Sequence, residues 1–425
     1  MSNKIGFWSV FALVTGSQIG TGAFFFPANL APYGIYGIIG WIISSGGAIA
    51  LSLVFASLCS RFPQTGGPHV YVQKAFGPSL AFFTGWTYWV ISWVSTTAVI
   101  VGAIGYLSPF IGKQPNIVYL SLEILLLFGI AILNLKGVKA AGRVEFLLTI
   151  LKFVPLIFIP AIALFYFDSN NFIVDNEVSK LTISKILGQV TLLTLWGFIG
   201  LESATAPAGS VENPSKTIPK AIVFGTICVA FIYIISNIGV MGLISGNELV
   251  KSKAPYVDVV QLIFGGQWHL AISLISSIIC IGTLNAWVLT SGQIALGLAE
   301  DKLMPSFFAK KNKNSAPLYG LIISCLGILP LLILTSSDNL SKQITSIIEI
   351  SVISFLFVYL ICSFAFLKLL IIENIKANYY HLIFGFIAII FCSFVIYETP
   401  FSTLCIASLF TISGIPVYLF QQKKL

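Results

Sequence analysis

Two short stretches place glycines and polar side chains inside otherwise apolar sequence. Residues 16–27 read GSQIGTGAFFFP, and residues 196–209 read WGFIGLESATAPAG. A break in a helix that crosses lipid leaves backbone amides and carbonyls unpaired. Such a break is tolerated only where it faces protein or a water-filled cavity. We therefore expect both stretches to interrupt a helix and to expose peptide groups that can bind a solute.

The two breaks offer opposite electrical poles. The half-helix that resumes after Gly22 presents N–H groups and a partial positive charge, which suits a carboxylate. The half-helix that ends near Trp196-Gly197 presents carbonyls and a partial negative charge, which suits an ammonium group. An α-amino acid fits this pair of poles.

A second interpretation of the glycines stays open. Gly16 and Gly20 have the GxxxG spacing that lets helices pack closely. Packing alone does not explain why Gln18, Thr21 and Glu202 lie at the breaks, so we favour the binding interpretation.

The composition places these breaks in a membrane protein. Of 425 residues, 57% are hydrophobic and only 9% are charged, whereas soluble domains carry about a quarter charged residues. A spanning helix needs roughly 20 apolar residues, and the apolar runs predict about twelve spans. We expect an all-α integral membrane protein with spans near residues 7–30, 35–59, 80–110, 117–134, 143–166, 185–208, 218–245, 266–298, 317–336, 343–369, 379–397 and 400–420.

The loops predict the orientation. Alternate loops hold sixteen lysines and arginines against six in the other set. The positive-inside rule places the richer set in the cytoplasm. We therefore expect a multi-pass protein of the inner (plasma) membrane with both termini cytoplasmic. The net charge of +8 lies mostly in these short loops and does not indicate nucleic acid.

The breaks fall in the first and the sixth span. Interrupted helices at corresponding positions of two halves are the best sequence indication of a transporter's binding site. They correspond if residues 7–166 and 185–369 form two inverted repeats of five helices, with residues 379–420 adding two more. The whole chain, 1–425, is then a single transmembrane domain.

Other function classes find little support. The seven cysteines lie in apolar stretches and the three histidines are scattered, so we expect no metal, cofactor or disulfide. No pore filter or phosphate loop is visible, and an intramembrane enzyme would need a base at depth, where no histidine lies.

Four stretches resemble the amino acid–polyamine–organocation (APC) transporter family, and most specifically its arginine/agmatine and basic amino acid antiporters. They are GSQIGTGAFFFPANLA (16–31), PQTGGPHVYVQKAFGP (63–78), LWGFIGLESATAPAGSVENPSKTIPKAI (195–222) and LNAWVLTSGQIALGLAEDKLMP (284–305). The resemblance implies twelve helices with a 5+5 inverted repeat, discontinuous helices 1 and 6, alternating access, a small amino acid or amine as substrate and in many cases a homodimer.

The resemblance also implies roles for individual residues. It places Trp196 as a lid toward the outside, Trp287 on the inner wall, and Tyr88, Glu202 and Tyr359 at an inner gate. The residues expected around the substrate are Ser17, Gln18, Ile19, Thr21, Gly22, Ser92, Thr96, Trp196, Ile199, Trp287 and Ser351.

Two departures leave the substrate open. Thr96 and Ser17 stand where the arginine/agmatine exchanger has asparagines. Another amino acid or amine is therefore an alternative to arginine, and proton-coupled uptake is an alternative to exchange.

Ionisable residues inside spans are functional candidates by default. Glu202 is the strongest, because it lies on the second break and could exchange a proton between conformations. The resemblance suggests that Lys152 stands in for a sodium ion and touches the first and eighth helices, while snorkelling is the alternative. Glu123 and Glu349 lie nearer the outer face and are expected to be solvated or paired.

Overall fold

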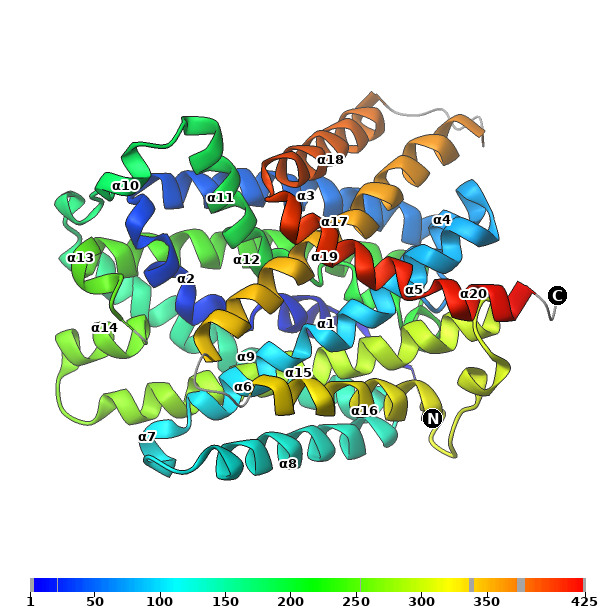
Figure 1. The fold of residues 1–425 in the computed structure, drawn as a ribbon, viewed down its shortest axis with the longest axis horizontal. Helices are drawn as coiled ribbons and strands as arrows, with labels where there is room; N and C mark the ends of the chain where they lie inside the picture. The colour runs from blue at the N-terminus through cyan, green and yellow to red at the C-terminus, as the bar shows by residue number, and fades with distance from the viewer. Residues whose placement is uncertain (1–3, 21, 253, 336–339, 373–378, 423–425) are drawn as a thin grey trace.

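The chain folds into a bundle of long helices that run roughly side by side (Figure 1). The computed structural model describes residues 4–20, 22–252, 254–335, 340–372 and 379–422. Within these ranges every regular element is a helix, apart from isolated bridges between Ile5 and Val211 and between Lys311 and Pro317. The predicted all-α class is confirmed.

The described helices reproduce the twelve predicted spans. Eleven helical stretches are long and apolar enough to cross a membrane, and α16 is an apolar helix only slightly shorter. The spans, in chain order, are α1 (Phe7–Gln18) with α2 (Gly22–Leu30), α3 (Ile35–Arg61), α5 (Pro78–Val94) with α6 (Thr96–Gly105), α8 (Asn116–Leu135), α9 (Val138–Ala163), α11 (Ile183–Leu195), α12 (Pro214–Leu243), α15 (Trp268–Glu300), α16 (Leu318–Thr335), α17 (Leu340–Ile372), α18 (Tyr379–Glu398) and α19 (Phe401–Ile412) with α20 (Ile415–Gln422).

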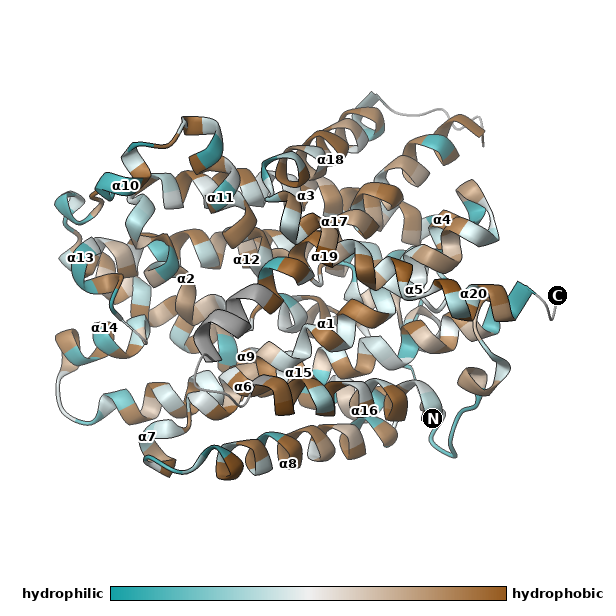
Figure 2. Cartoon of the chain, in the orientation of Figure 1, coloured by the Kyte–Doolittle hydropathy of each residue, from teal (hydrophilic) through white to brown (hydrophobic). Residues whose placement is uncertain are grey.

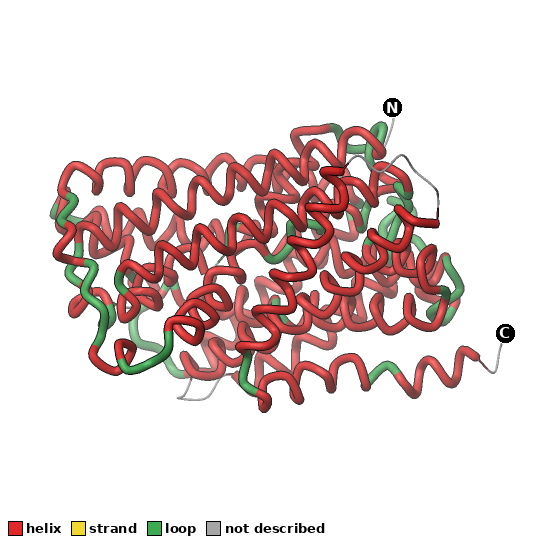
Figure 3. Tube along the Cα trace, turned by 90° about the horizontal axis from the view of Figure 1, so that it is seen from above, coloured by secondary structure: helices red, strands yellow, loops and turns green. Residues whose placement is uncertain are grey.

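Short helices connect the spans at both ends of the bundle. They are α4 (Pro68–Phe76), α7 (Ser108–Ile111), α10 (Asn176–Ser179), α13 (Gly246–Leu249) and α14 (Pro255–Phe264). In Figure 1, α10, α13 and α14 lie at one end of the bundle, whereas α4 and both chain ends lie at the other. Figure 3 shows the two chain ends on the same side again. An even number of spans requires this arrangement.

The first span lies at the centre of the bundle and the last lies at its edge. In the most apolar window of Phe7–Tyr33, 88% of residues are buried, against 11% for Phe401–Gln422. Figure 2 shows hydrophobic residues along the lengths of the outer helices and hydrophilic ones gathered at the two ends. This distribution matches an apolar band between two aqueous faces.

Two boundaries differ from the sequence prediction in ways that matter for the site. The fifth span begins at Val138 and not at 143, after Gly137 turns the chain with φ +100°. The third span is interrupted at Ser95, where α5 ends and α6 begins.

Loop 62–67, which follows α3, packs against the far end of the second break. The Gly66 amide donates to the Ala206 carbonyl at 2.9 Å, and the Gly209 amide donates to Thr65 Oγ1 at 3.1 Å. His69 on α4 pairs with Asp301 at 3.0 Å, which ties this region to the end of α15. The interrupted sixth span is thus held at one end by loop 62–67 and α4.

Candidate functional site

The first span is broken at the predicted position. Helix α1 ends at Gln18, Ile19 is extended with φ −87° and ψ 95°, and α2 begins at Gly22. Thr21, which we expected beside the substrate, lies outside the described residues. The N–H groups at the start of α2 have no helical carbonyl before them, as at any helix N-terminus.

Side chains from three other helices bind the carbonyls that the break leaves free. Lys152 Nζ on α9 donates to Gly16 O at 2.7 Å, and Thr283 Oγ1 on α15 is 2.6 Å from Ile19 O. Trp287 Nε1 donates to Ser17 O at 3.2 Å, and Tyr233 OH on α12 donates to Gln18 O at 3.0 Å. The end of α1 therefore keeps its open shape without unpaired carbonyls in a dry interior.

The sixth span is broken over a longer distance. Helix α11 ends at Leu195, residues 196–198 form a single 3₁₀ turn, and Ile199 is extended. Gly200 then adopts φ +103°, a conformation that residues with a side chain rarely adopt. After Glu202, two further 3₁₀ turns, Ser203–Thr205 and Ala208–Ser210, lead to α12.

The two breaks touch each other. Ser17 Oγ lies 2.9 Å from Gly200 O and 2.8 Å from Ser203 Oγ. A Cβ added at Gly200 would lie only 2.7 Å from Ser17 Oγ. The glycine is needed both for its backbone angle and for this close approach.

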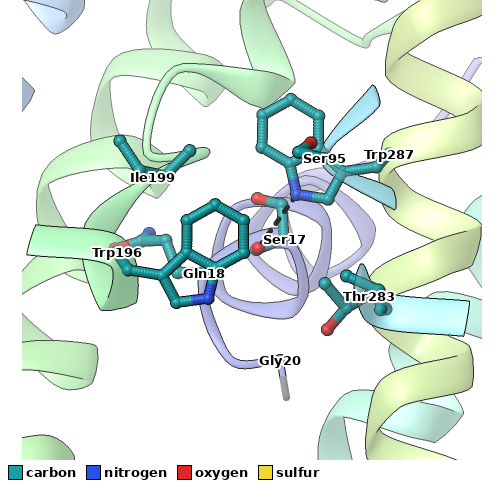
Figure 4. Close-up of a pocket in the computed structure, with 9 residues that line it drawn as sticks. Ser17, Gln18, Gly20, Ser95, Trp196, Ile199, Thr283 and Trp287 are labelled. Carbon is teal, nitrogen blue, oxygen red and sulfur yellow. Dashed lines mark hydrogen bonds between the residues drawn. The ribbon is translucent and has the colours of Figure 1, made fainter. Parts of the chain in front are cut away.

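A small cavity lies between the breaks (Figure 4). Its volume of about 20 Å³ is room for roughly one water molecule. Its lining consists of Ser17, Gln18, Gly20, Ser95, Val99, Trp196, Ile199, Thr283 and Trp287. None of these side chains carries a formal charge, so a substrate cation here would meet indole faces and peptide dipoles.

Two indole rings fill most of the space between the breaks. A Cβ added at Gly22 would lie 2.6 Å from Cδ1 of Trp196, so this ring rests on the start of α2. Trp287 packs against Phe355 with ring centroids 5.2 Å apart. In Figure 4 the two rings lie on opposite sides of Ser17.

Of the residues expected around the substrate, Ser17, Gln18, Trp196, Ile199 and Trp287 line the cavity. Ile19 and Gly22 lie at the first break beside it. The remaining three expected residues lie outside the cavity lining.

Ser92 and Thr96 hydrogen-bond to the carbonyls of Trp89 and Trp93 on their own helix segment. Ser351 is fully buried on α17, and its hydroxyl finds no hydrogen-bond partner among the described residues. From α5 and α6, the cavity is lined by Ser95 and Val99 and not by Ser92 and Thr96.

The expected gate residues form a cluster around Glu202. Tyr359 OH lies 2.5 Å from Glu202 Oε2 and accepts from the Gly200 amide at 3.3 Å. Tyr88 lies beside the same carboxyl. All three side chains are fully buried, and Glu202 Oε1 has no hydrogen-bond partner in the described part of the chain. The cluster therefore connects the Glu202 carboxyl, through Tyr359, to the backbone of the second break.

Sequence reasoning missed three residues of this region. Thr283 lies one helical turn before Trp287 on α15, and that spacing could have revealed it. Ser95 marks the break between α5 and α6, which no sequence signal indicated. Glu145 is fully buried next to Lys152, although its position near the predicted start of the fifth span favours an exposed side chain.

The fold and these interrupted spans define a multi-pass membrane transporter. A model of the amino acid permease family matches residues 5–418. The chain therefore belongs to this family, whose members include the APC transporters that the four motifs resemble. The family and the relatives below are transporters and not enzymes.

Several relatives match most of the chain. A putrescine transporter of Haemophilus influenzae is 29% identical over 100% of this chain and 98% of its own length. A putative arginine/ornithine antiporter of Bacillus subtilis is 28% identical over 93% and 91%. An arginine/ornithine antiporter of Pseudomonas aeruginosa is 32% identical over 74% of this chain and 68% of its own.

Proposed function

We propose that this transporter exchanges basic amino acids or their amines across the plasma membrane by alternating access. The observation that carries the proposal is the meeting of two interrupted helices at one cavity with two indole rings. Opposed helix ends suit the carboxylate and the ammonium of an amino acid. The names of the relatives, which include antiporters of arginine, ornithine, lysine and cadaverine, support the substrate class.

The neutral lining is compatible with a cationic side chain. A cation over an indole face gains about 0.5–2 kcal/mol, and Trp196 and Trp287 offer two such faces. Ser17 provides a hydroxyl at the cavity where the arginine/agmatine exchanger has an asparagine amide, whereas Thr96 lies outside the lining and hydrogen-bonds to Trp93 O. We therefore keep ornithine, lysine, arginine and their amines as one substrate class.

Close packing and binding both use the glycines. A Cβ at Gly16 would lie 1.9 Å from Glu145 Oε1, and one at Gly20 would lie 2.9 Å from Thr283 Cγ2. At both positions a side chain of a neighbouring helix occupies the space that a larger residue would need. The small glycines therefore leave room for side chains that contact the first break. The packing interpretation and the binding interpretation are compatible.

Proton-coupled uptake is a second candidate, favoured by the buried Glu202 cluster. Counterflow in proteoliposomes distinguishes the two modes. We expect uptake of labelled arginine, ornithine, lysine or putrescine only into vesicles that hold a countersubstrate. Uptake into empty vesicles driven by a pH gradient would reject obligatory exchange and favour the permease.

Three further expectations accompany the proposal. We propose that both termini are cytoplasmic, that residues 7–166 and 185–369 are inverted repeats with 379–420 appended, and that the transporter forms a homodimer.

A further inference from the structure

A buried ion pair lies next to the first break. Lys152 and Glu145, both on α9, have no solvent-exposed side-chain surface, and Lys152 Nζ is 3.4 Å from Glu145 Oε1. A buried charge is costly unless it is paired and hydrogen-bonded. Other contacts must therefore compensate the cost of burying this ion pair.

The ammonium uses all three of its N–H donors. One goes to Gly16 O at 2.7 Å, one to Thr283 Oγ1 at 3.1 Å and one to Glu145. Gly16 O is among the last four carbonyls of α1, which have no partner within the helix. Lys152 thus fixes the end of α1 immediately before it breaks.

Glycines on both neighbouring helices make room for the pair. The Cβ clash of 1.9 Å at Gly16 is with Glu145 Oε1. On α15, a Cβ at Gly282 would lie 2.8 Å from Lys152 Cε and 3.0 Å from its Nζ. Any larger residue at either position would displace one member of the pair.

Hydrogen bonds hold the carboxylate in place from its other side. Asn285 Nδ2 on α15 donates to Glu145 Oε2 at 2.9 Å and to Ala141 O at 3.1 Å. Asn134 Nδ2 on α8 donates to Asn285 Oδ1 at 3.1 Å. A chain of bonds therefore runs from α8 through α15 and α9 to the broken end of α1.

We propose that Glu145 is a positioning residue for transport, which holds the Lys152 ammonium on the carbonyl end of the first break. The inference rests on the proposed function, because it gives the break its role in binding substrate. Glu145 touches no substrate. It acts through Lys152, and its loss would release Gly16 O and let the cavity wall at Ser17 and Gln18 shift.

The test is a double-mutant cycle in the full-length transporter. Glu145→Gln, Lys152→Met and the double variant are purified and compared with wild type for binding of labelled arginine, ornithine, lysine and putrescine, and for counterflow. Size-exclusion chromatography and thermal unfolding monitor folding. Glu123→Gln, a substitution of another buried glutamate outside this chain of bonds, serves as the matched control.

We expect Glu145→Gln to raise KM about tenfold, with a smaller change in maximal rate, because the binding geometry is disturbed. In the Lys152→Met background the same substitution should change KM by less than about twofold, since the residues act as a unit. Glu145→Asp, which keeps the charge, should show a smaller loss of the same kind and replaces Glu145→Gln if that variant does not fold.

Wild-type KM for Glu145→Gln, or an equal loss in both backgrounds, would overturn the positioning role. Changes in thermal stability with unchanged KM would assign the pair to structure alone. Absence of counterflow by the wild type would reject the exchange function itself. In that case, substrate binding to purified wild type and Glu145→Gln still tests the positioning role of Glu145.

Discussion

At the scale of single residues, the site depends on side chains that bind backbone carbonyls. Trp287 is one of them, since its indole both walls the cavity and donates to Ser17 O. At the other break, Glu202 accepts a hydrogen bond from Tyr359 OH. These two residues give the sharpest single-site tests.

Trp287→Ala should weaken binding of every substrate by about tenfold or more, because truncation removes both a buried aromatic wall and a hydrogen bond. Trp287→Phe should lose less, because it keeps a ring and loses only the donor. Equilibrium binding to purified protein measures both. Trp268→Ala, at the exposed start of the same helix, is the control, and unchanged binding by Trp287→Ala would assign this ring to packing.

Glu202→Gln should flatten the pH dependence of exchange. Glutamine imitates the protonated carboxyl, so the variant should behave at every pH as the wild type does at low pH. The exchange rate is measured from about pH 5 to 9, a range in which a buried carboxyl can titrate. Glu300→Gln, which breaks the exposed pair with Lys311, should leave the profile unchanged. A wild-type profile for Glu202→Gln would reject a proton role.

At the scale of elements, the second break depends on one glycine. Gly200 has φ +103°. A Cβ added there would lie 2.7 Å from Ser17 Oγ and 3.0 Å from Trp287 Cζ2. The structure therefore couples the shape of the sixth span to that of the first.

Gly200→Ala should abolish exchange and lower the free energy of unfolding by about 1–3 kcal/mol, because it forces a strained backbone and a clash. Gly46→Ala on α3, where an added Cβ meets nothing within 4 Å, should be neutral or slightly stabilising. Thermal unfolding measures the stability of the two variants, and counterflow measures their exchange. Exchange by Gly200→Ala would show that the second break tolerates a different backbone conformation at this position.

The sequence predicted the elements better than their contacts. Hydropathy placed all twelve spans, and the glycines placed both breaks, because an interrupted apolar run is a local signal. Glu145 escaped because it lies only two residues inside the predicted start at 143, where a carboxylate is expected to reach water, whereas α9 begins five residues earlier, at Val138. Ser95 escaped because it is one of four hydroxyl residues within 92–97, and no sequence pattern selects it among them.

At the scale of the whole molecule, the charge asymmetry makes a prediction about orientation. Lys180 lies beyond α10, and Lys313 lies between η7 (Ser306–Ala309) and α16. Both side chains are exposed, and α10 lies at the opposite end of the bundle from both chain ends in Figure 1.

We expect Lys180→Cys to react with a membrane-impermeant maleimide in intact cells and Lys313→Cys to react only in inside-out vesicles. The lysine-rich loops should stay in the cytoplasm by the positive-inside rule. Both substitutions are made in a background with Cys405→Ser, since Cys405 is exposed in the native chain. The reverse labelling pattern would invert the orientation.

The tightness of the resting cavity has a consequence for selectivity. With space for about one water, the cavity has to enlarge before it can hold an amino acid. Part of the binding free energy of every solute then goes into opening the cavity. The observed affinity is lower than the affinity of the open form by the fraction of molecules that are open. Discrimination between similar amines should then appear mainly in turnover, and a variant that opens more readily would bind more tightly while choosing less strictly.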